Sequence, residues 1–313
     1  MYPWGDERRF NSYNRFLKRR FSGRIQKLTL DAGFSCPNRD GTIGTGGCTY
    51  CCNDAFNPAY CNPSKSIRQQ IDEGIRFHHR HGIEPLGYLA YFQAFSNTYA
   101  PLSCLRELYE EAADHPGVRG LIIATRPDCL DAPLLEYLKE LQKRLYVKLE
   151  IGMESCRDET LRRINRGHDL ACAVRAIGQA AAHHIPMGTH LIFGLPGERP
   201  EHWLEDLAII NRLPLQSIKF HQLQIIRGTA MEAEYRQHPD EFFALSFDTY
   251  VSFIADYVER LSPDIVIERF AAEVPQRFLA TPSWGGIRYD QVVGAIEREL
   301  ASRESWQGRH QIL

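Results

Sequence analysis

The stretch "CPNRDGTIGTGGCTYCCN", residues 36–53, is a thiol-rich loop directly after the first expected strand, 27–31. Four of the chain's nine cysteines fall within this stretch. Four glycines lie between its first two cysteines, so the loop has little with which to build an apolar core. Glycine adopts backbone conformations that other residues avoid, and a glycine-rich chain can bend around a bulky group. The pattern therefore predicts a binding loop.

Cys36, Cys48 and Cys51 have the spacing C-x11-C-x2-C, which is compatible with three kinds of site. Free cysteines are often simply buried, although the glycine-rich surroundings disfavour this interpretation here. A structural zinc site could take Cys61 as its fourth thiolate, but a second C-x2-C pair is missing. An iron–sulfur cluster held by three cysteines would keep one iron open for a substrate or cofactor. In that case Cys52 and Cys61 are spare thiols.

The composition is that of an ordinary globular protein of 313 residues, with 43% hydrophobic and 24% charged residues. The net charge of −2 gives no overall basic signature of nucleic-acid binding. Residues 1–30 nevertheless hold eight Lys/Arg against two acidic residues, so we expect a basic N-terminal arm over 1–24. An odd number of unevenly spread cysteines argues against a disulfide framework. We expect a cytoplasmic protein with no secretory leader and no membrane contact.

Apolar strand-like segments alternate with amphipathic helical segments along most of the chain. Strands are expected at 27–31, 86–93, 118–126, 146–153, 186–195 and 217–226, with an added one at 264–270. Helices are expected at 66–82, 100–117, 131–145, 157–165, 169–184, 200–213, 241–261 and 288–305. Such alternation indicates a parallel sheet covered by helices, either an open doubly wound sheet or a barrel. We expect a core over 25–235 and an α/β extension over 236–313 packed on it.

Polar and glycine-rich segments follow the expected strands at their carboxyl ends, where ligands bind in parallel α/β folds. This placement predicts one site to which every strand contributes. Arg126 and Asp128 lie where a strand meets its loop, and Lys219 and His221 alternate on the sixth strand, where both could face the interior. The segments that follow the second to fifth strands are "QAFSNTY", "TRPD", "GMES" and "GLPGE".

The cysteine loop and the motifs after the strands resemble the radical S-adenosylmethionine (SAM) superfamily. The likeness is strong over residues 25–230. The long first gap between cysteines is similar to the branch that contains the catalytic subunit of Elongator, which acts on tRNA wobble uridine, and to a family of short stand-alone bacterial proteins. The matching motifs besides the loop are "TRPD" (125–128), "EIGMES" (150–155), "INRGH" (164–168) and "GLPGE" (194–198).

The resemblance implies a partial (β/α)6 barrel and a [4Fe-4S] cluster held by Cys36, Cys48 and Cys51, with Tyr50 packed beside it. It also implies that SAM binds at the open iron. One electron, from a donor such as flavodoxin or ferredoxin, then cleaves SAM to a 5′-deoxyadenosyl radical that abstracts hydrogen from the substrate. It assigns no catalytic residue.

The resemblance extends, motif by motif, to candidate SAM-binding residues. Arg166 suits the SAM carboxylate, because a guanidinium binds that group with two hydrogen bonds. Glu154 stands where relatives have a Gln that contacts the ribose, and His190 stands where relatives often have an acidic residue. Relatives carry Gly-Gly-Glu where this chain has Phe92-Gln93-Ala94, so only a backbone contact is implied there. The full set is Gln93, Ala94, Glu154, Ser155, Asn165, Arg166 and His190.

The substrate is less well determined than the reaction type. The basic, aromatic arm and the likeness to the Elongator branch favour tRNA, because Lys and Arg bind phosphates and aromatic rings stack on bases. A small-molecule substrate fits the mildly acidic bulk of the chain as well. A non-catalytic zinc or iron–sulfur interaction protein is the hypothesis from another class.

Overall fold

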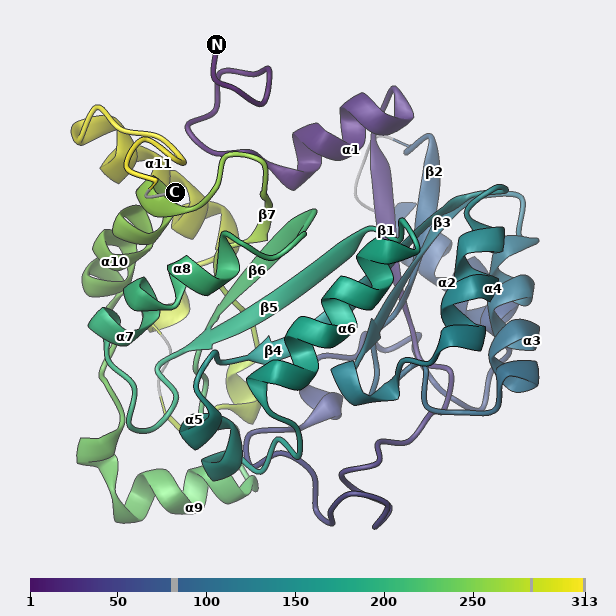
Figure 1. Cartoon of the computed structure of the whole chain (residues 1–313), viewed down its shortest axis with the longest axis horizontal. Coiled ribbons are helices and arrows are strands. Elements are labelled where there is room, and N and C mark those ends of the chain that lie inside the picture. The colour runs from purple at the N-terminus through teal and green to yellow at the C-terminus, as the bar shows by residue number, and fades with distance from the viewer. Residues whose placement is uncertain (80–83, 282–283, 312–313) are drawn as a thin grey trace.

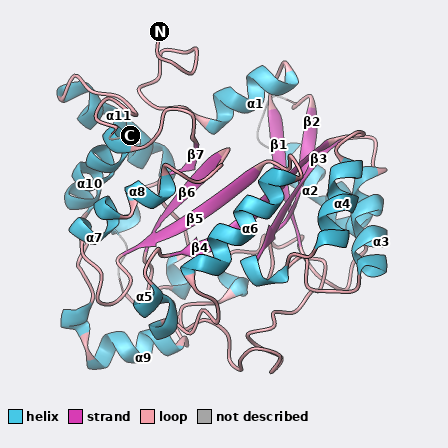
Figure 2. Ribbon diagram, in the orientation of Figure 1, coloured by secondary structure: helices cyan, strands magenta, loops and turns pink. Residues whose placement is uncertain are grey.

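The computed structural model describes residues 1–79, 84–281 and 284–311 and is built on one 7-stranded parallel sheet in the order β1-β2-β3-β4-β5-β6-β7 (Figures 1 and 2). Each strand pairs with the next one along the chain, and the sheet curls into a half-barrel with β1 and β7 at its edges. The barrel interpretation of the sequence is thereby confirmed, and the added seventh strand is present. The strands are β1 (Ile25–Leu30), β2 (Gly87–Phe92), β3 (Val118–Thr125), β4 (Tyr146–Glu154), β5 (Met187–Phe193), β6 (Ser217–Gln222) and β7 (Val266–Arg269).

Helices connect successive strands and cover the outside of the sheet (Figure 2). Asp131 and Asp169 cap two of them, accepting hydrogen bonds from Leu134 N at 2.9 Å and Cys172 N at 2.7 Å. The helices are α1 (Tyr13–Phe21), α2 (Ile67–His79), α3 (Leu102–Ala113), α4 (Ala132–Leu141), α5 (Asp158–Arg163), α6 (Leu170–Ala182), α7 (Pro200–Glu205), α8 (Leu207–Ile210), α9 (Ala230–Gln237), α10 (Phe247–Arg260) and α11 (Tyr289–Ser302).

The helix boundaries differ from the expected ones in a few places. The helix expected over 200–213 is two, α7 and α8, which meet at Asp206. The helix expected over 241–261 begins only at Phe247, and α9 was not expected at all. The end expected for α2 at residue 82 lies outside the described residues.

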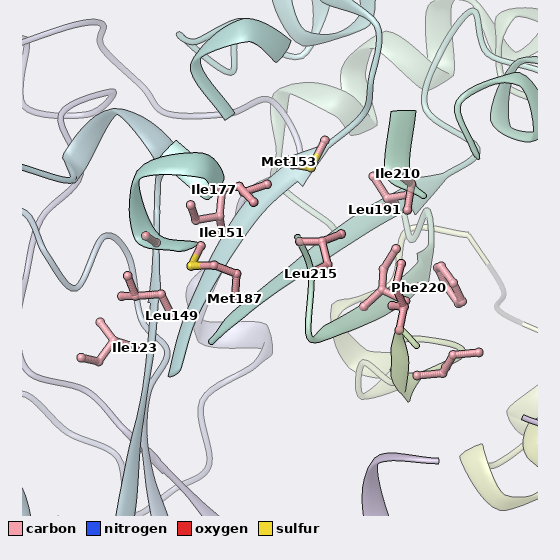
Figure 3. Packing of buried hydrophobic residues seen from close by; sticks show 14 of the residues in the cluster. Ile123, Leu149, Ile151, Met153, Ile177, Met187, Leu191, Ile210, Leu215 and Phe220 are labelled. Carbon is pink, nitrogen blue, oxygen red and sulfur yellow. The ribbon is translucent and has the colours of Figure 1, made fainter. Parts of the chain in front are cut away.

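The main hydrophobic core lies between the outer face of the sheet and its helices. Apolar side chains of β3, β4, β5 and β6 pack there against α6 and α8, as Figure 3 shows for Ile151, Met187 and Ile177. Because alternate strand residues point to opposite faces, the other half of each strand faces the barrel interior. Those inward residues are largely polar or charged, and they form the site.

Helix α1 crosses the end of the barrel where the strands begin, opposite the cysteine loop, which follows the end of β1 (Figure 1). Tyr13 and Leu17 of α1 are buried with Leu89, Tyr146 and Val266, which belong to strands on both sides of the barrel. The N-terminal arm therefore packs as a cover over one end of the barrel.

Residues before α1 pack on the C-terminal part of the chain. Asn11 N donates to Gln307 Oε1 at 2.8 Å, and Gln307 N donates to Arg9 O at 2.9 Å. Ser12 forms a parallel bridge with Ile267 of β7. The domain limits at 24/25 and 235/236 stay predictions. Within the described residues, every helix is too short or too polar to cross a membrane.

Candidate active site

A cavity of about 570 Å³ is lined by residues of the cysteine loop, of the strands and of α1. Its lining combines the three cysteines of the C-x11-C-x2-C pattern with inward side chains of β2, β4, β5, β6 and β7. The structure thus brings residues from distant parts of the sequence to one chamber, as the strand-end pattern predicted. Other lining residues at the cysteine end are Arg39, Tyr50, Phe95, Arg126, Glu154, Arg166, His190 and His221.

Cys36, Cys48 and Cys51 are free thiols that line this cavity together. Cys61, in contrast, lies outside its lining and donates a hydrogen bond to Thr29 O at 2.8 Å, so the four-thiolate zinc set is not assembled. Cys52 does line the cavity but packs with Phe56 against a small apolar cluster. Among the described residues, no three His, Cys, Asp or Glu side chains converge on a point that one metal ion could occupy.

Two asparagines join the cysteine loop to the segment after α5. Asn38 Nδ2 donates to Asn165 O at 2.5 Å, and Asn165 Nδ2 donates to Gly47 O at 2.8 Å. Asn165 adopts a positive φ of 52°, and Gly47 a φ of 79°. Asn165, which the motif suggested as a SAM contact, therefore stabilises the cysteine loop through hydrogen bonds and lies outside the cavity lining.

Arg166 lies at the junction of the loop and β4. Its Nη1 donates to Cys48 Sγ at 3.5 Å, its Nη2 donates to Gly152 O at 2.8 Å, and Nη2 is 3.4 Å from Glu154 Oε1. Its Nε is buried with no partner among the described residues. An unpartnered buried donor is costly unless a ligand satisfies it. The Nη1 atom of Arg166 therefore lies beside Cys48, one of the three cysteines that line the cavity.

Glu154 forms the second part of this group. Its Oε2 lies 3.1 Å from His190 Nδ1. Burial alone would raise the pKa of Glu154, but His190 and Arg166 outweigh burial and lower the pKa to about 2. The side chain is therefore an anion at neutral pH and accepts hydrogen bonds.

Gly152 makes the close approach of these side chains possible. A Cβ added there would lie 2.4 Å from Glu154 Oε1 and 2.7 Å from Arg166 Nη2. The β4–β5 register shifts between Gly152 and Glu154, and Glu154 has a φ of 68°. Glu154 lies on the inward face of β4, as Lys148 and Glu150 do, and lines the cavity.

Ser155, the next residue along the chain, lies outside the cavity lining. Ser155 Oγ donates to Glu198 Oε1 at 2.5 Å, and Trp203 Nε1 donates to Glu198 Oε2 at 2.5 Å. Ala94 is buried outside the cavity lining, whereas Gln93 lines it. Of the suggested SAM contacts, the structure therefore gathers Gln93, Glu154, Arg166 and His190 at the cavity.

A network of charged side chains at the α1 end of the barrel was missed, apart from Lys219. It consists of Lys27, Lys148, Glu150, Lys219 and Glu268, from four different strands. The only sequence signal is a charged residue at alternate positions of otherwise apolar strands, as in "YVKLE" (146–150).

Comparison with known protein families agrees with this geometry. Residues 40–210 match the model of the radical SAM superfamily, and residues 215–301 match that of the Radical_SAM C-terminal domain. The chain belongs to the radical SAM superfamily. It is an enzyme of that superfamily, whose members bind a [4Fe-4S] cluster and SAM.

Relatives of this radical SAM protein include both full-length and partial matches. YtqA of Bacillus subtilis (strain 168) is 36% identical over 310 residues, which are 98% of this chain and 95% of YtqA. The tRNA uridine(34) acetyltransferase of Dehalococcoides mccartyi is 24% identical over 199 residues, 62% of this chain but only 40% of that protein. The structure of Methanocaldococcus infernus Elp3 shares the fold with a TM-score of 0.69 at 13% identity, over 90% of this chain and 64% of that one.

The residues present fit the two cofactors of a radical SAM protein. Three thiols around one chamber are soft ligands suited to iron. Gly41, Gly46 and Gly47 have φ values of 79–92°, which only glycine adopts easily, so the loop can curve around a cluster. The buried, unpartnered Arg166 Nε and the anionic Glu154 provide a donor and an acceptor for a polar ligand beside the cysteines.

Proposed function

We propose that this radical SAM enzyme modifies tRNA at the wobble uridine. The observation that carries the proposal is the likeness to tRNA uridine(34) acetyltransferase, which covers 62% of this chain. Because the chain spans 40% of that relative, the relative's whole activity is not transferred. What is transferred is the substrate class, a uridine in tRNA.

We assign the cofactor contacts as follows. Cys36, Cys48 and Cys51 would hold the cluster, Arg166 would bind the SAM carboxylate, and Glu154 would accept from the ribose. Bound together, the cluster and SAM supply a one-electron cleavage that allows hydrogen abstraction from an unreactive C–H bond. The protein's own residues position the ligand and exclude water from the chamber. A flavodoxin or ferredoxin is the proposed electron donor, and the nine free cysteines suit the reducing cytoplasm.

An aromatic–guanidinium pair at the cysteine end of the cavity supports a nucleobase substrate. Arg39 Cζ lies 5.6 Å from the ring centroid of Phe95, and both side chains are exposed and line the cavity. Unstacked bases of RNA are commonly held on aromatic rings and guanidinium planes. The basic residues Lys18 and Arg19 of α1 lie at the other end of the barrel and can contact only a distant part of a tRNA (Figure 1).

The decisive experiment is mass spectrometry of tRNA nucleosides from a strain that lacks the gene. We expect a modified wobble uridine to disappear or a precursor to accumulate, and complementation to restore the wild-type profile. An unchanged nucleoside profile would overturn the assignment to tRNA and favour a small-molecule substrate.

A matched pair of variants tests the proposed base contact. Phe95→Ala should reduce tRNA modification by about 5-fold to 150-fold, since base stacking contributes about 1–3 kcal/mol. Phe77→Ala removes a comparably exposed phenylalanine from α2 and should leave modification unchanged. Equal activity of the two variants would contradict the stacking role.

A further inference from the structure

Three ammonium groups and only two carboxylates lie together at the α1 end of the barrel, and of these Lys27, Lys219 and Glu268 line the cavity. Lys148 Nζ lies 3.2 Å from Glu150 Oε1 and also contacts Glu268. Lys219 contacts Glu150, and Lys27 Nζ lies 2.7 Å from Glu268 Oε2. The group therefore has one positive charge more than its carboxylates can neutralise.

Other residues that line the cavity do not remove this excess positive charge. Arg269 and Glu273 both line the cavity, both are exposed, and their opposite charges cancel. Helix α1 contributes the uncharged Tyr13, Asn14 and Leu17. Among the described residues that line this end, the balance stays at one positive charge.

A buried excess charge is unfavourable unless a partner compensates it. Lys148 is fully buried at its side chain, whereas the side chain of Lys27 is 25% exposed and lines the cavity. The ammonium of Lys27 therefore faces the space in which a ligand would lie. Burial, together with Lys219 and Lys148, outweighs the two carboxylates and lowers the pKa of Lys27 to about 8. The network alone thus holds its last proton weakly.

The position of these ammonium groups relative to the cysteine end suits a substrate tail. Lys219 and His221 lie two residues apart on β6, which corresponds to about 6–7 Å along a strand. The ring of His221 lies 5.8 Å from that of His190, which contacts Glu154. Lys219 and the lysines around it therefore lie closer to α1 than His190 and Glu154, which are assigned above to SAM.

We propose that the α1 end of the cavity binds a carboxylate of the substrate, held by Lys27 and Lys219. A carboxylate brings the single negative charge that the network lacks. A phosphate monoester would bring about 1.5 to 2 negative charges. A phosphodiester would need its chain to continue beyond the site, where Tyr13 and Leu17 of α1 cover the barrel. The inference rests on the cavity as the place of reaction. Uridine itself has no carboxylate, so for a tRNA substrate the carboxylate would belong to a substituent that the uridine already carries.

The test is a calorimetric titration of the anaerobic holoprotein, with SAM bound, at constant ionic strength and pH 8. The probes are acetate, the uncharged acetamide, and methyl phosphate. We expect saturable binding of acetate, none of acetamide, and weaker binding of methyl phosphate. Because a bound anion stabilises the charged form of Lys27, acetate binding at pH 8 should take up protons, which titrations in buffers of different ionisation enthalpy measure.

Matched variants locate the binding. Lys27→Met and Lys219→Met each leave two cations against two carboxylates, and each should weaken acetate binding at least tenfold. Lys27→Met should also abolish proton uptake. Lys18→Met, which removes an exposed lysine of α1, should bind acetate as the wild type does.

Equal binding of acetate and acetamide, unchanged binding in both cavity variants, or tighter binding of methyl phosphate would overturn the carboxylate assignment. If one lysine variant does not fold, the other still tests the site. A lost carboxylate site together with an altered tRNA profile in the deletion strain would leave the tRNA proposal intact. The two proposals can therefore fail separately.

Discussion

Replacing Gly152 by alanine tests the geometry of the proposed SAM site with a single added methyl group. The new Cβ would lie 2.4 Å from Glu154 Oε1 and 2.7 Å from Arg166 Nη2, both closer than real Cβ contacts allow. Neither side chain can move freely, because Glu154 is held by His190 and Arg166 by Cys48. Overpacking of this kind typically costs about 1–3 kcal/mol of stability. We expect Gly152→Ala to lower the free energy of unfolding by that amount.

The same change should weaken SAM binding at least tenfold, since it displaces the acceptor and the donor assigned to the ligand. The assays are thermal unfolding of the purified protein and SAM binding to the anaerobically reconstituted protein by equilibrium dialysis. Gly178→Ala is the matched control: it lies in α6 with no atom within 4 Å of the added Cβ, and alanine favours a helix over glycine by about 1 kcal/mol. If Gly152→Ala unfolds and binds SAM as the wild type does, the reasoning about this site is wrong.

Three further substitutions test other parts of the molecule. Cys48→Ala should abolish iron retention after anaerobic reconstitution, whereas Cys61→Ala, outside the cavity, should keep it; iron analysis measures both. Glu268→Gln leaves three ammonium groups, among them the fully buried Lys148, against one carboxylate. It should cost about 3–5 kcal/mol in denaturant unfolding, with partial recovery on adding Lys27→Met. Burial raises the pKa of Asp206 to about 7, so the folded state binds this proton more tightly than the unfolded state does. The free energy of unfolding should therefore fall as the pH rises from about 4 to 7. Asp206→Asn should flatten this dependence when unfolding is measured over that pH range.

The strands were predictable because short segments with apolar residues at alternate positions, or in a continuous run, recur between amphipathic helical segments. Helix α9 was missed, because Met231 is the one buried residue in "AMEAEYRQ" and gives no apolar periodicity. The basic arm was expected as a separate segment, yet Tyr13 and Leu17 of α1 are among the buried residues at the end of the barrel. Sequence periodicity shows that such a helix has an apolar face, but not which surface that face covers.

In the site, sequence spacing was informative for residues that are close in sequence and uninformative about contacts between residues far apart in it. Cys36, Cys48 and Cys51 were identified from their spacing and do line one cavity. Glu154 and Ser155 were equal candidates, because the motif places them side by side. Strand alternation separates them, because Glu154 shares the inward face of β4 with Lys148 and Glu150, whereas Ser155 contacts Glu198. The partner of Ser155 could not be predicted, because Glu198 lies 43 residues further along the chain.

The arrangement of the barrel changes what the basic N-terminal arm can be used to argue. Its lysines and arginines suggested an RNA-binding segment, but α1 covers the end of the barrel where the strands begin (Figure 1). The cysteine loop and the exposed Arg39–Phe95 pair lie at the opposite end. A uridine that reacts beside the cysteines therefore cannot be in contact with α1. The role that the structure supports for α1 is to close the barrel with Tyr13, whose ring centroid lies 4.6 Å from Lys27 Nζ. The case for tRNA therefore depends on the relatives and on the residues at the cysteine end of the cavity. The N-terminal arm instead limits the depth of the cavity at the end that α1 closes, where it contributes uncharged side chains to the lining.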